Sequence, residues 1–402
     1  MAIPRLLTAI LICSAYGAAQ SQPRVTTLYN FTGAADGSYP SAQVVIGSGG
    51  VLYGTTYFGG AGGQGTAFSL TPPGAPGDPW IESTLFSGFG DGGGPNSRLA
   101  IGSGGVLYGT TVSGGIYNVG MVFSLTPPSS PGGDWIRAVL HNFNINRRGD
   151  GPAGVVVSAE GILYGTCGGG EFPEAGTVFA LVPPATPGVA WPMGLLYTFS
   201  EGDDGYLPGS GVVIGSGGTL YGTTVTGGSS DAGTVYALTP PAVAGGSWTE
   251  TVLYSFMGGA DGFEPIWTPV IGSGGVLYGT TSGGGSANGG TVFSLTPPAS
   301  AGGSWTHAVL YNFPTPQPGP VTLSRRGVLY GMTNSAAAGT AFALEPPASP
   351  GGSWTYRLLG MLAGSSALGF PTGFTIDEDG VLYGTVHEGG TYGYGMVFAL
   401  TP

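Results

Sequence analysis

A unit of about 55 residues occurs seven times along this chain of 402 residues. Every copy contains the tripeptide Leu-Tyr-Gly, which is followed by Thr in six copies and by Met in one. The tyrosines of the seven copies are Tyr53, Tyr108, Tyr164, Tyr221, Tyr278, Tyr330 and Tyr383. A repeat of this length with several short apolar segments is typical of a radial array of β-sheets. We therefore predict an all-β fold, a seven-bladed β-propeller.

One copy, residues 205–256, indicates how each blade would fold. It contains four short runs of apolar, β-branched and aromatic residues, which are separated by glycine-rich or proline-rich turns. The runs are residues 211–214, 219–224, 233–238 and 248–256. Pro240 and Pro241 would end the third run, because proline has no N–H for the ladder of a sheet. The pattern predicts four antiparallel strands in each blade.

The fourth run is found only six times after the first Leu-Tyr-Gly motif. Its copies begin at Trp80, Trp135, Trp191, Trp248, Trp305 and Trp354. The seventh copy is near the N-terminus, where residues 25–31 (Val-Thr-Thr-Leu-Tyr-Asn-Phe) match residues 309–313 (Val-Leu-Tyr-Asn-Phe). We expect residues 25–31 to form the outer strand of the last blade, whose other strands lie within residues 372–401. This pairing would close the ring and remove exposed strand edges.

Glycine and proline are abundant, with 82 and 33 residues, and such a composition alone would favour a disordered chain. Disorder also requires low hydrophobicity and high charge, whereas this chain is 41% hydrophobic and 7% charged. The glycines recur at fixed places in the repeat, as turn residues do. We predict a single folded domain over residues 20–402.

The N-terminus has the pattern of a secretory signal peptide. Arg5 precedes an apolar run at residues 6–15, and Gly17-Ala18-Ala19 supplies the small residues of a cleavage site. We predict a signal peptide over residues 1–19 and a protein that is secreted or held at the cell surface or in the periplasm. Cleavage would leave Cys167 as the only cysteine, so that no disulfide could form within the chain.

The net charge is −12, with 21 acidic residues against 9 basic ones. This excess of negative charge makes nucleic acid an unsuitable partner. No stretch after the signal reaches the roughly 18 apolar residues that a membrane-spanning helix needs, so we expect no membrane insertion. We expect a monomer whose partner is a carbohydrate or another surface protein.

The whole repeat resembles a known family. A full copy runs from Asp261-Gly262 through Leu-Tyr-Gly-Thr at residues 277–280 to Gly-Thr-Val-Phe at residues 290–293. These motifs resemble the tandem repeat of exported bacterial proteins called GloVer, after Gloeobacter and Verrucomicrobia, and the resemblance covers residues 25–402. It implies export and commonly a C-terminal surface-sorting tail, whereas this chain stops at Thr401-Pro402. The family implies no established activity, so it supplies no catalytic residues.

A repeated Asp-Gly pair lies where the fourth strand of one blade would lead to the first strand of the next. Its aspartates are Asp36, Asp91, Asp150, Asp204 and Asp261. Asp-Gly is first of all a turn dipeptide, because the aspartate bonds its own backbone and the glycine accepts a positive φ. The alternative is a broken ring of carboxylates that binds a ligand, together with Tyr206 and Phe263, which each follow one of the pairs.

Calcium is the metal that such a ring of carboxylates would suit. The sequence contains no loop of the EF-hand type, so a Ca²⁺ site would draw on several loops. The residues that we consider for it are Asp203, Asp204 and Asp261. No other cofactor is expected.

Aromatic residues also gather in the loops that would share a face with the Asp-Gly turns. They are Tyr39, Tyr57, Phe58, Phe89, Tyr117, Phe172, Tyr206, Phe263, Tyr392 and Tyr394. Exposed rings beside carboxylates would suit stacking on a saccharide with hydrogen bonds to its hydroxyls. The alternative is that these rings fold back and pack on the tops of the blades.

The sequence lacks a nucleophile elbow and a clustered set of histidines, and we expect no catalytic residue. Our main hypothesis is an exported, non-catalytic propeller that serves as a ligand-binding or interaction scaffold, with carbohydrate as the first candidate. One alternative is a structural repeat protein of the cell envelope. Another is a glycan-active hydrolase or lyase, which would need two carboxylates about 5–10 Å apart, among Asp203, Asp204, Glu171 and Glu174.

Overall fold

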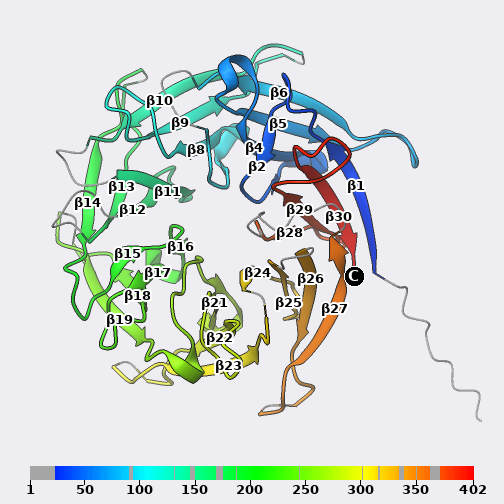
Figure 1. Cartoon of the computed structure of the whole chain (residues 1–402). Coiled ribbons are helices and arrows are strands. Elements are labelled where there is room, and N and C mark those ends of the chain that lie inside the picture. The colour runs from blue at the N-terminus through cyan, green and yellow to red at the C-terminus, as the bar shows by residue number, and fades with distance from the viewer. Residues whose placement is uncertain are drawn as a thin grey trace, which may run out of the picture.

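Seven β-sheets surround a central axis in a computed structural model of the chain (Figure 1). The structure describes residues 23–89, 94–130, 132–144, 150–168, 175–186, 188–243, 245–300, 302–315, 317–334, 339–349, 351–362 and 372–402. Within these residues the chain forms strands, turns and short 3-10 helices but no α-helix. No helix in the described part is long and apolar enough to cross a membrane. The predicted seven-bladed propeller is confirmed, whereas the expected signal peptide, residues 1–19, lies outside the described residues.

Each blade contains antiparallel strands that follow one another from the central axis outward to the rim. Blade 1 consists of β2 (Ser38–Pro40) and β3 (Val45–Ile46), β4 (Leu52–Phe58), β5 (Thr66–Thr71) and β6 (Ile81–Ser87); blade 2 of β7 (Ala100–Ile101), β8 (Leu107–Thr111), β9 (Met121–Thr126) and β10 (Ile136–Asn142). Blade 3 consists of β11 (Asp150–Val157), β12 (Leu163–Gly168), β13 (Thr177–Leu181) and β14 (Met193–Thr198); blade 4 of β15 (Tyr206–Pro208) and β16 (Val213–Ile214), β17 (Leu220–Thr226), β18 (Thr234–Thr239) and β19 (Thr249–Ser255). Blade 5 consists of β20 (Val270–Ile271), β21 (Leu277–Thr281), β22 (Thr291–Thr296) and β23 (Thr306–Asn312); blade 6 of β24 (Pro318–Leu323), β25 (Leu329–Thr333), β26 (Gly339–Glu345) and β27 (Thr355–Leu362); blade 7 of β28 (Phe374–Ile376), β29 (Leu382–Val386), β30 (Met396–Thr401) and β1 (Arg24–Asn30).

The glycine of every Leu-Tyr-Gly motif lies opposite an aromatic residue on the next strand outward. The seven register pairs are Gly54–Phe68, Gly109–Phe123, Gly165–Phe179, Gly222–Tyr236, Gly279–Phe293, Gly331–Phe342 and Gly384–Phe398. All seven aromatic side chains are at most 1% exposed. In blade 5, a Cβ atom on Gly279 would lie 2.5 Å from Cζ of Phe293. The motif therefore needs glycine because the ring occupies the space of a side chain.

The tyrosine of the same motif connects neighbouring blades. In six of the seven contacts between blades it packs edge-on against the tryptophan that precedes the outer strand of the next blade, with ring centroids 5.9–6.2 Å apart. The pairs are Tyr53–Trp135, Tyr108–Trp191, Tyr164–Trp248, Tyr221–Trp305, Tyr278–Trp354 and Tyr383–Trp80. Aromatic pairs of this geometry add roughly 0.5–1.5 kcal/mol beyond the area that they bury. One Leu-Tyr-Gly-Thr segment thus stabilises both its own sheet and the contact with the next.

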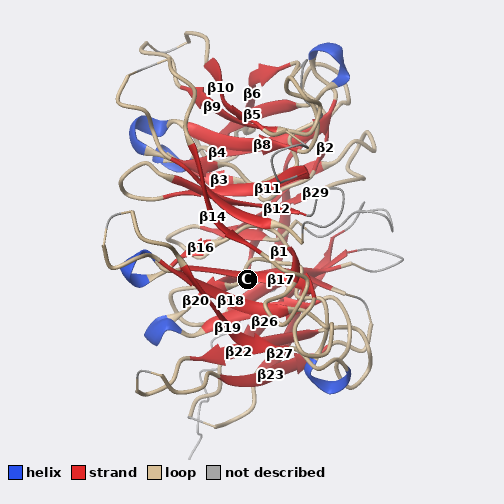
Figure 2. Ribbon diagram, turned by 90° about the vertical axis from the view of Figure 1, so that its left-hand side faces the viewer, coloured by secondary structure: helices blue, strands red, loops and turns tan. Residues whose placement is uncertain are grey.

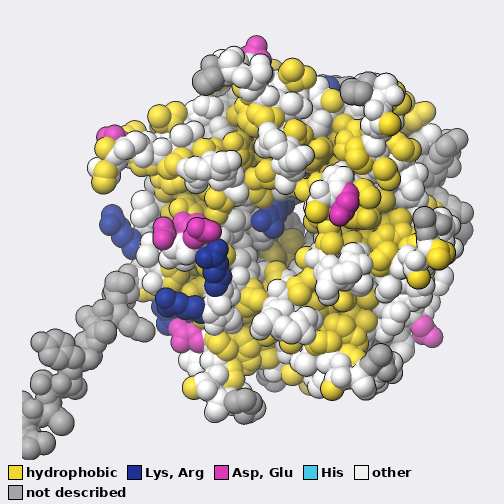
Figure 3. Space-filling model, turned by 180° about the vertical axis from the view of Figure 1, so that it is seen from behind, with side chains coloured by type: hydrophobic (Ala, Val, Ile, Leu, Met, Phe, Trp, Pro, Cys, Tyr) yellow, Lys and Arg dark blue, Asp and Glu magenta, His cyan; other side chains and the backbone are white. Residues whose placement is uncertain are grey.

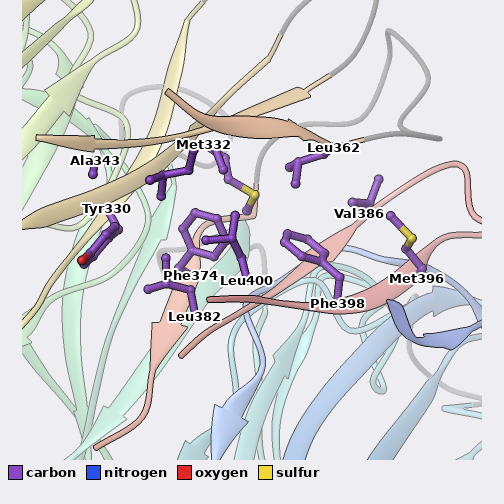
Figure 4. Packing of buried hydrophobic residues seen from close by; sticks show 12 residues of the cluster. Tyr330, Met332, Ala343, Leu362, Phe374, Leu382, Val386, Met396, Phe398 and Leu400 are labelled. Carbon is purple, nitrogen blue, oxygen red and sulfur yellow. The ribbon is translucent and has the colours of Figure 1, made fainter. Parts of the chain in front are cut away.

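The contact between blades 6 and 7 is built differently. Pro23, not tryptophan, precedes the outer strand of blade 7, so Tyr330 lacks the partner that the other motif tyrosines have. Met332 and Leu362 of blade 6 instead share a buried cluster with Phe374 and Phe398 of blade 7 (Figure 4). Tyr330 and Met332 are both buried in this cluster, with 9% and 1% of their surface exposed.

The N-terminal strand closes the ring. β1 pairs antiparallel with β30, in a register that runs from Arg24 opposite Thr401 to Asn30 opposite Met396. The side chain of Asn30 extends this contact, because its Oδ1 accepts a hydrogen bond of 2.9 Å from the backbone N–H of Thr391. The predicted closure is confirmed, and in Figure 1 the blue strand β1 lies beside the red strand β30.

Deletion of residues 20–31 should lower the melting temperature by many degrees or prevent folding, because it exposes the edge of β30 and the core beneath β1. Thermal unfolding followed by circular dichroism measures the effect. A chain that begins at Pro23 and keeps all of β1 is the control. Equal melting temperatures for the two truncated chains would contradict closure as a source of stability.

Gly279→Ala should lower the free energy of unfolding by about 1–3 kcal/mol, because the added methyl group would overlap the ring of Phe293. Urea denaturation measures this loss. Gly194→Ala is the matched control, since Gly194 is exposed in β14 and a Cβ atom there meets nothing within 4 Å. The control should change stability by no more than about 0.5 kcal/mol. Equal effects of the two substitutions would show that the glycine–aromatic contact is unimportant.

Candidate functional site

Two sets of loops share one face of the disc, as the sequence predicted. The loops that lead into a blade hydrogen-bond to the loops between its second and third strands. In three blades the bonds are Gly60 N–H to Ala34 O at 2.8 Å, Gly228 N–H to Gly202 O at 3.0 Å and Gly285 N–H to Gly259 O at 2.7 Å. We call this side the loop face. In Figure 2 loops and turns project from both sides of the disc.

The carboxylate of Asp36 on the loop face is held within its own turn. Asp36 is 8% exposed and accepts hydrogen bonds from the backbone N–H of Thr32 at 2.7 Å and from its hydroxyl at 2.6 Å. The hydroxyl of Tyr29, on the outer strand β1, donates a third bond at 3.0 Å. Burial and this carboxylate together raise the pKa of Tyr29 well above its ordinary value. The aspartate thus connects the turn to the strand before it.

Asp204 and Asp261 repeat this arrangement in blades 4 and 5. Asp204 accepts from the N–H of Ser200 at 2.9 Å and from the hydroxyl of Tyr197 at 2.9 Å. Asp261 accepts from the hydroxyl of Tyr254 at 2.9 Å, and burial together with this bond raises the pKa of Tyr254 to about 12. These contacts support the interpretation of the Asp-Gly pairs as turn residues.

The remaining carboxylates are not gathered into a cluster in the described part. Asp91 lies outside the described residues, and Asp150 is described only by its backbone, at the start of β11. Asp203 is exposed beside Asp204. Among the described residues, no group of three or more Asp, Glu, His or Cys side chains could hold a metal ion. Calcium binding at Asp203, Asp204 and Asp261 stays a prediction.

Tyr206 and Phe263 have half-buried rings that pack on the blades. Tyr206 begins β15 and contacts the core between blades 3 and 4. Phe263 forms a bridge with Gly283, and a Cβ atom on Gly283 would lie 2.2 Å from Cζ of the phenylalanine ring. Both rings therefore have a structural contact, and their part in ligand binding stays a prediction.

An aromatic patch does form on the loop face, where blade 7 meets blade 1. We define it as Tyr39, Tyr57, Phe58, His387 and Tyr394. The ring centroid of Tyr39 lies 6.0 Å from that of Phe58, 5.1 Å from that of His387 and 6.1 Å from that of Tyr394. The ring centroids of Tyr57 and Phe58 are 4.6 Å apart. Phe58 is 50% exposed and Tyr394 is 39% exposed, so two rings of the patch remain open to solvent.

The backbone fixes the position of this patch. The N–H of Tyr39 donates to the carbonyl of Tyr394 at 2.8 Å, which joins the two blades on this face. The ring of Tyr394 lies over Gly33, where a Cβ atom would come within 2.7 Å of Cδ2. In Figure 1 the red loop after β29 lies across the start of blade 1. The patch therefore depends on the blade that β1 completes.

The other aromatic residues of the loops behave differently. Phe89 follows the packing alternative, because its ring is fully buried in the core between blades 1 and 2. Tyr392 is 58% exposed on the same loop as Tyr394. Tyr117 is 50% exposed in blade 2, away from the patch, and Phe172 lies outside the described residues.

The innermost strands line a central channel with a cavity of about 810 Å³. Figure 3 shows a hollow at the centre of the disc, with arginine-coloured atoms beside it. Most of the lining side chains are aliphatic, and the larger polar ones are Gln43, Asn96, Arg98 and Trp267. Arg98 is the one charged side chain among the described residues that line the cavity.

Arg98 has no hydrogen-bond or ion-pair partner among the described residues. Its side chain is exposed to the channel and is surrounded by the channel wall. The wall keeps bulk water away from the guanidinium group, and this desolvation lowers its pKa. Sequence reasoning missed this residue. A comparison of the copies at the third position after the proline, where Gln43 and Thr268 stand in other blades, would have shown it.

Glu250 is a second residue that sequence reasoning missed. It lies in β19 opposite Leu238, at the contact between blades 3 and 4, and its Oε1 is buried with no partner in the described part. Burial, and to a smaller extent the charge of Asp204, raise the pKa of Glu250 to about 7. A carboxyl group with a buried, unpaired oxygen at a blade contact should affect the stability of the fold more than ligand binding.

A comparison with known proteins identifies the repeat. The sequence profile of the Gloeobacter/Verrucomicrobia repeat matches residues 14–217 and 186–398. The chain belongs to this family. The match agrees with the resemblance that the Leu-Tyr-Gly and Asp-Gly motifs indicated. No curated protein is similar enough in sequence to match the GloVer chain.

Several solved structures have a similar fold. A protein from Lactobacillus plantarum has a TM-score of 0.56 at 16% identity, with 88% of this chain and 99% of that chain covered. An ulvan lyase, a polysaccharide lyase bound to a GlcA–Rha3S saccharide, has a TM-score of 0.54 at 10% identity, with 94% and 95% covered. A gluconolactonase from Xanthomonas campestris has a TM-score of 0.46 at 14% identity, with 77% and 86% covered. At these identities the similarity shows the propeller fold alone.

Glu250→Gln should change how stability depends on pH. The folded protein holds the proton of Glu250 up to a pH of about 7, whereas the ordinary pKa of a glutamate carboxyl group is 4.5. The folded state therefore binds more protons than the unfolded state in this range, and the free energy of unfolding falls as the pH rises through it. Urea denaturation across the range should show Glu250→Gln gaining stability relative to the wild type.

Glu378→Gln is the control for this experiment, because that side chain is 86% exposed. It should keep the pH dependence of the wild type. A constant difference between Glu250→Gln and the wild type across the range would contradict the raised pKa.

Proposed function

We propose that this GloVer protein is an exported, non-catalytic β-propeller that binds carbohydrate through the aromatic patch. The observation that carries the proposal is the set of neighbouring rings at the contact of blades 7 and 1, of which Phe58 is 50% exposed and Tyr394 is 39% exposed. The pattern of residues 1–19 supports export.

The chemistry of the patch suits a sugar ring. Aromatic faces stack on the apolar C–H face of a pyranose, and nearby polar groups accept or donate hydrogen bonds at its rim. His387 contacts Tyr39 in the patch, and its Nδ1 is buried without a partner among the described residues. Burial lowers the pKa of His387, which favours the neutral form of the ring. A neutral imidazole beside Tyr39 adds an uncharged ring to the patch.

The patch is also rigid, which lowers the cost of binding. The bond between Tyr39 and Tyr394 and the packing of Tyr394 on Gly33 hold the two blades together. Rings that are already in place lose little conformational freedom when a ligand binds. A saccharide ligand is therefore favoured over the structural envelope role, which requires no exposed aromatic surface.

The positions of three Asp-Gly carboxylates favour binding over hydrolysis, whereas Glu171 and Glu174 lie outside the described residues. Asp36, Asp204 and Asp261 each accept hydrogen bonds from their own turn and from a tyrosine hydroxyl. A general acid or base would have to leave these bonds to reach a glycosidic oxygen. Lyase activity is a property of the ulvan lyase, and a similar fold at 10% identity does not extend that activity to this chain.

Affinity electrophoresis in gels that contain xylan, laminarin, alginate, pectin or ulvan tests the proposal. We expect at least one polysaccharide to retard the wild type, and Phe58→Ala and Tyr394→Ala to weaken the apparent affinity about tenfold, since stacking of one ring contributes roughly 1–1.5 kcal/mol. Tyr117→Ala is the matched control, because Tyr117 is 50% exposed but lies outside the patch. Equal retardation of all variants, or no retardation by any polysaccharide, would contradict the proposal. Release of new reducing ends from a retarding polysaccharide would contradict the non-catalytic part.

A further inference from the structure

Arg98 occupies a place in the channel that no other blade fills with a charge. It is the third residue after Pro95, and the third residues after Pro40, Pro208 and Pro265 are Gln43, Gly211 and Thr268. In blades 3, 6 and 7 the segment from the proline to the motif tyrosine is one residue shorter. Arg98 therefore differs from the residues at the same position of the other copies, and it has no packing role that the repeat requires.

Asn96 and Arg98 lie in the segment between Pro95 and β7, and both residues line the cavity. Ser97, between them, has its hydroxyl 2.7 Å from that of Thr110, on the neighbouring strand of the blade. Asn96 and Arg98 therefore face the channel as a pair.

Two further polar atoms at this cavity lack partners. Oδ1 of Asn96 and Nε1 of Trp267 are buried and make no hydrogen bond within the described part of the chain. Buried polar atoms are almost always bonded, so orphaned ones at a cavity indicate a water molecule or a ligand. Around this cavity the unsatisfied groups are the guanidinium of Arg98, an indole N–H and one amide oxygen.

This set of groups defines the chemistry of a ligand. A guanidinium group offers five N–H donors in a planar fork that matches carboxylate and sulfate oxygens. An indole N–H is a further donor, whereas an amide oxygen needs a hydroxyl from the ligand. We propose that the central channel binds a small hydroxylated oxyanion, whose carboxylate or sulfate group is held by Arg98.

This site is separate from the aromatic patch, and its existence does not depend on the proposed function. The patch involves loops of blades 7 and 1, whereas Arg98 and Trp267 lie in the segments that lead into the inner strands β7 and β20 of blades 2 and 5. Either site can fail its test while the other passes.

Thermal melts of the purified protein test the proposal, with sodium sulfate, sodium D-glucuronate, D-glucose or sodium chloride added and the ionic strength held constant. A ligand that binds only the folded state raises its melting temperature. We expect sulfate or glucuronate to raise the melting temperature of the wild type by several degrees over chloride, with no such rise from glucose. A larger rise with glucuronate than with sulfate assigns the site to an acidic sugar, whereas a rise with sulfate alone would overturn the hydroxylated part of the proposal.

Arg98→Gln should lose this rise, and without added anion it should melt no lower than the wild type, because it removes a charge that has no partner. Arg325→Gln is the control, since Arg325 is exposed and pairs with Glu378 at 3.0 Å. Sulfate also stabilises proteins in general by exclusion from their surface. An equal rise in Arg98→Gln and the wild type would therefore overturn the proposal.

Trp267 provides a second measurement. A saturable change in tryptophan fluorescence on titration with glucuronate or sulfate is expected in the wild type, and its loss is expected in both Arg98→Gln and Trp267→Phe. The other six tryptophans precede outer strands of the blades and lie away from the channel wall. A fluorescence change that persists in Arg98→Gln would also overturn the proposal.

Discussion

The contact between a glycine and an aromatic ring on the adjacent strand determines the geometry of every blade. Gly279 and Phe293 are one of seven such register pairs. A side chain in place of the glycine would push the ring away from the sheet and toward the next blade. Because each ring also fills the space between two blades, one local contact sets both the thickness of a sheet and its spacing from the neighbouring sheet. The Tyr–Trp pairs then hold neighbouring blades at that spacing in six of the seven contacts between blades.

The repeat in the sequence allowed the number of blades and the closure by β1 to be predicted, because both follow from counting copies of a pattern. Side-chain directions at single positions could not be predicted in the same way. Phe89 follows a predicted outer strand and looks like a loop residue, but it packs at the contact of two blades. The bonds from Tyr29 to Asp36 join residues seven apart across a turn, and only the folded turn brings their atoms together. Arg98 could not be predicted from the repeat, because the repeat is defined by the residues that all blades share. A unique site in a symmetric ring depends on a residue that only one blade has.

The two proposed sites both occur where the sevenfold symmetry is broken. The aromatic patch lies where the last blade meets the first, and its rings come from loops that differ from those of the other copies. The channel site depends on a single arginine in blade 2 and on Trp267 in blade 5. Identical blades would give a symmetric surface with no unique place for a ligand. Departures at few positions are sufficient to create one, because the Gly–aromatic contacts keep the scaffold unchanged.

The antiparallel pairing of β1 with β30 has a mechanical consequence. Arg24 lies opposite Thr401, so both ends of the described chain meet at the same corner of the disc. The hydrogen bonds of an antiparallel pair lie perpendicular to the strands. A force that pulls the two ends apart would break these hydrogen bonds one after another in the unzipping geometry. It would not load them all at once, as a shearing force would. If the protein were tethered through both ends, the ring would open at this strand under a small load while the other six blades remained folded.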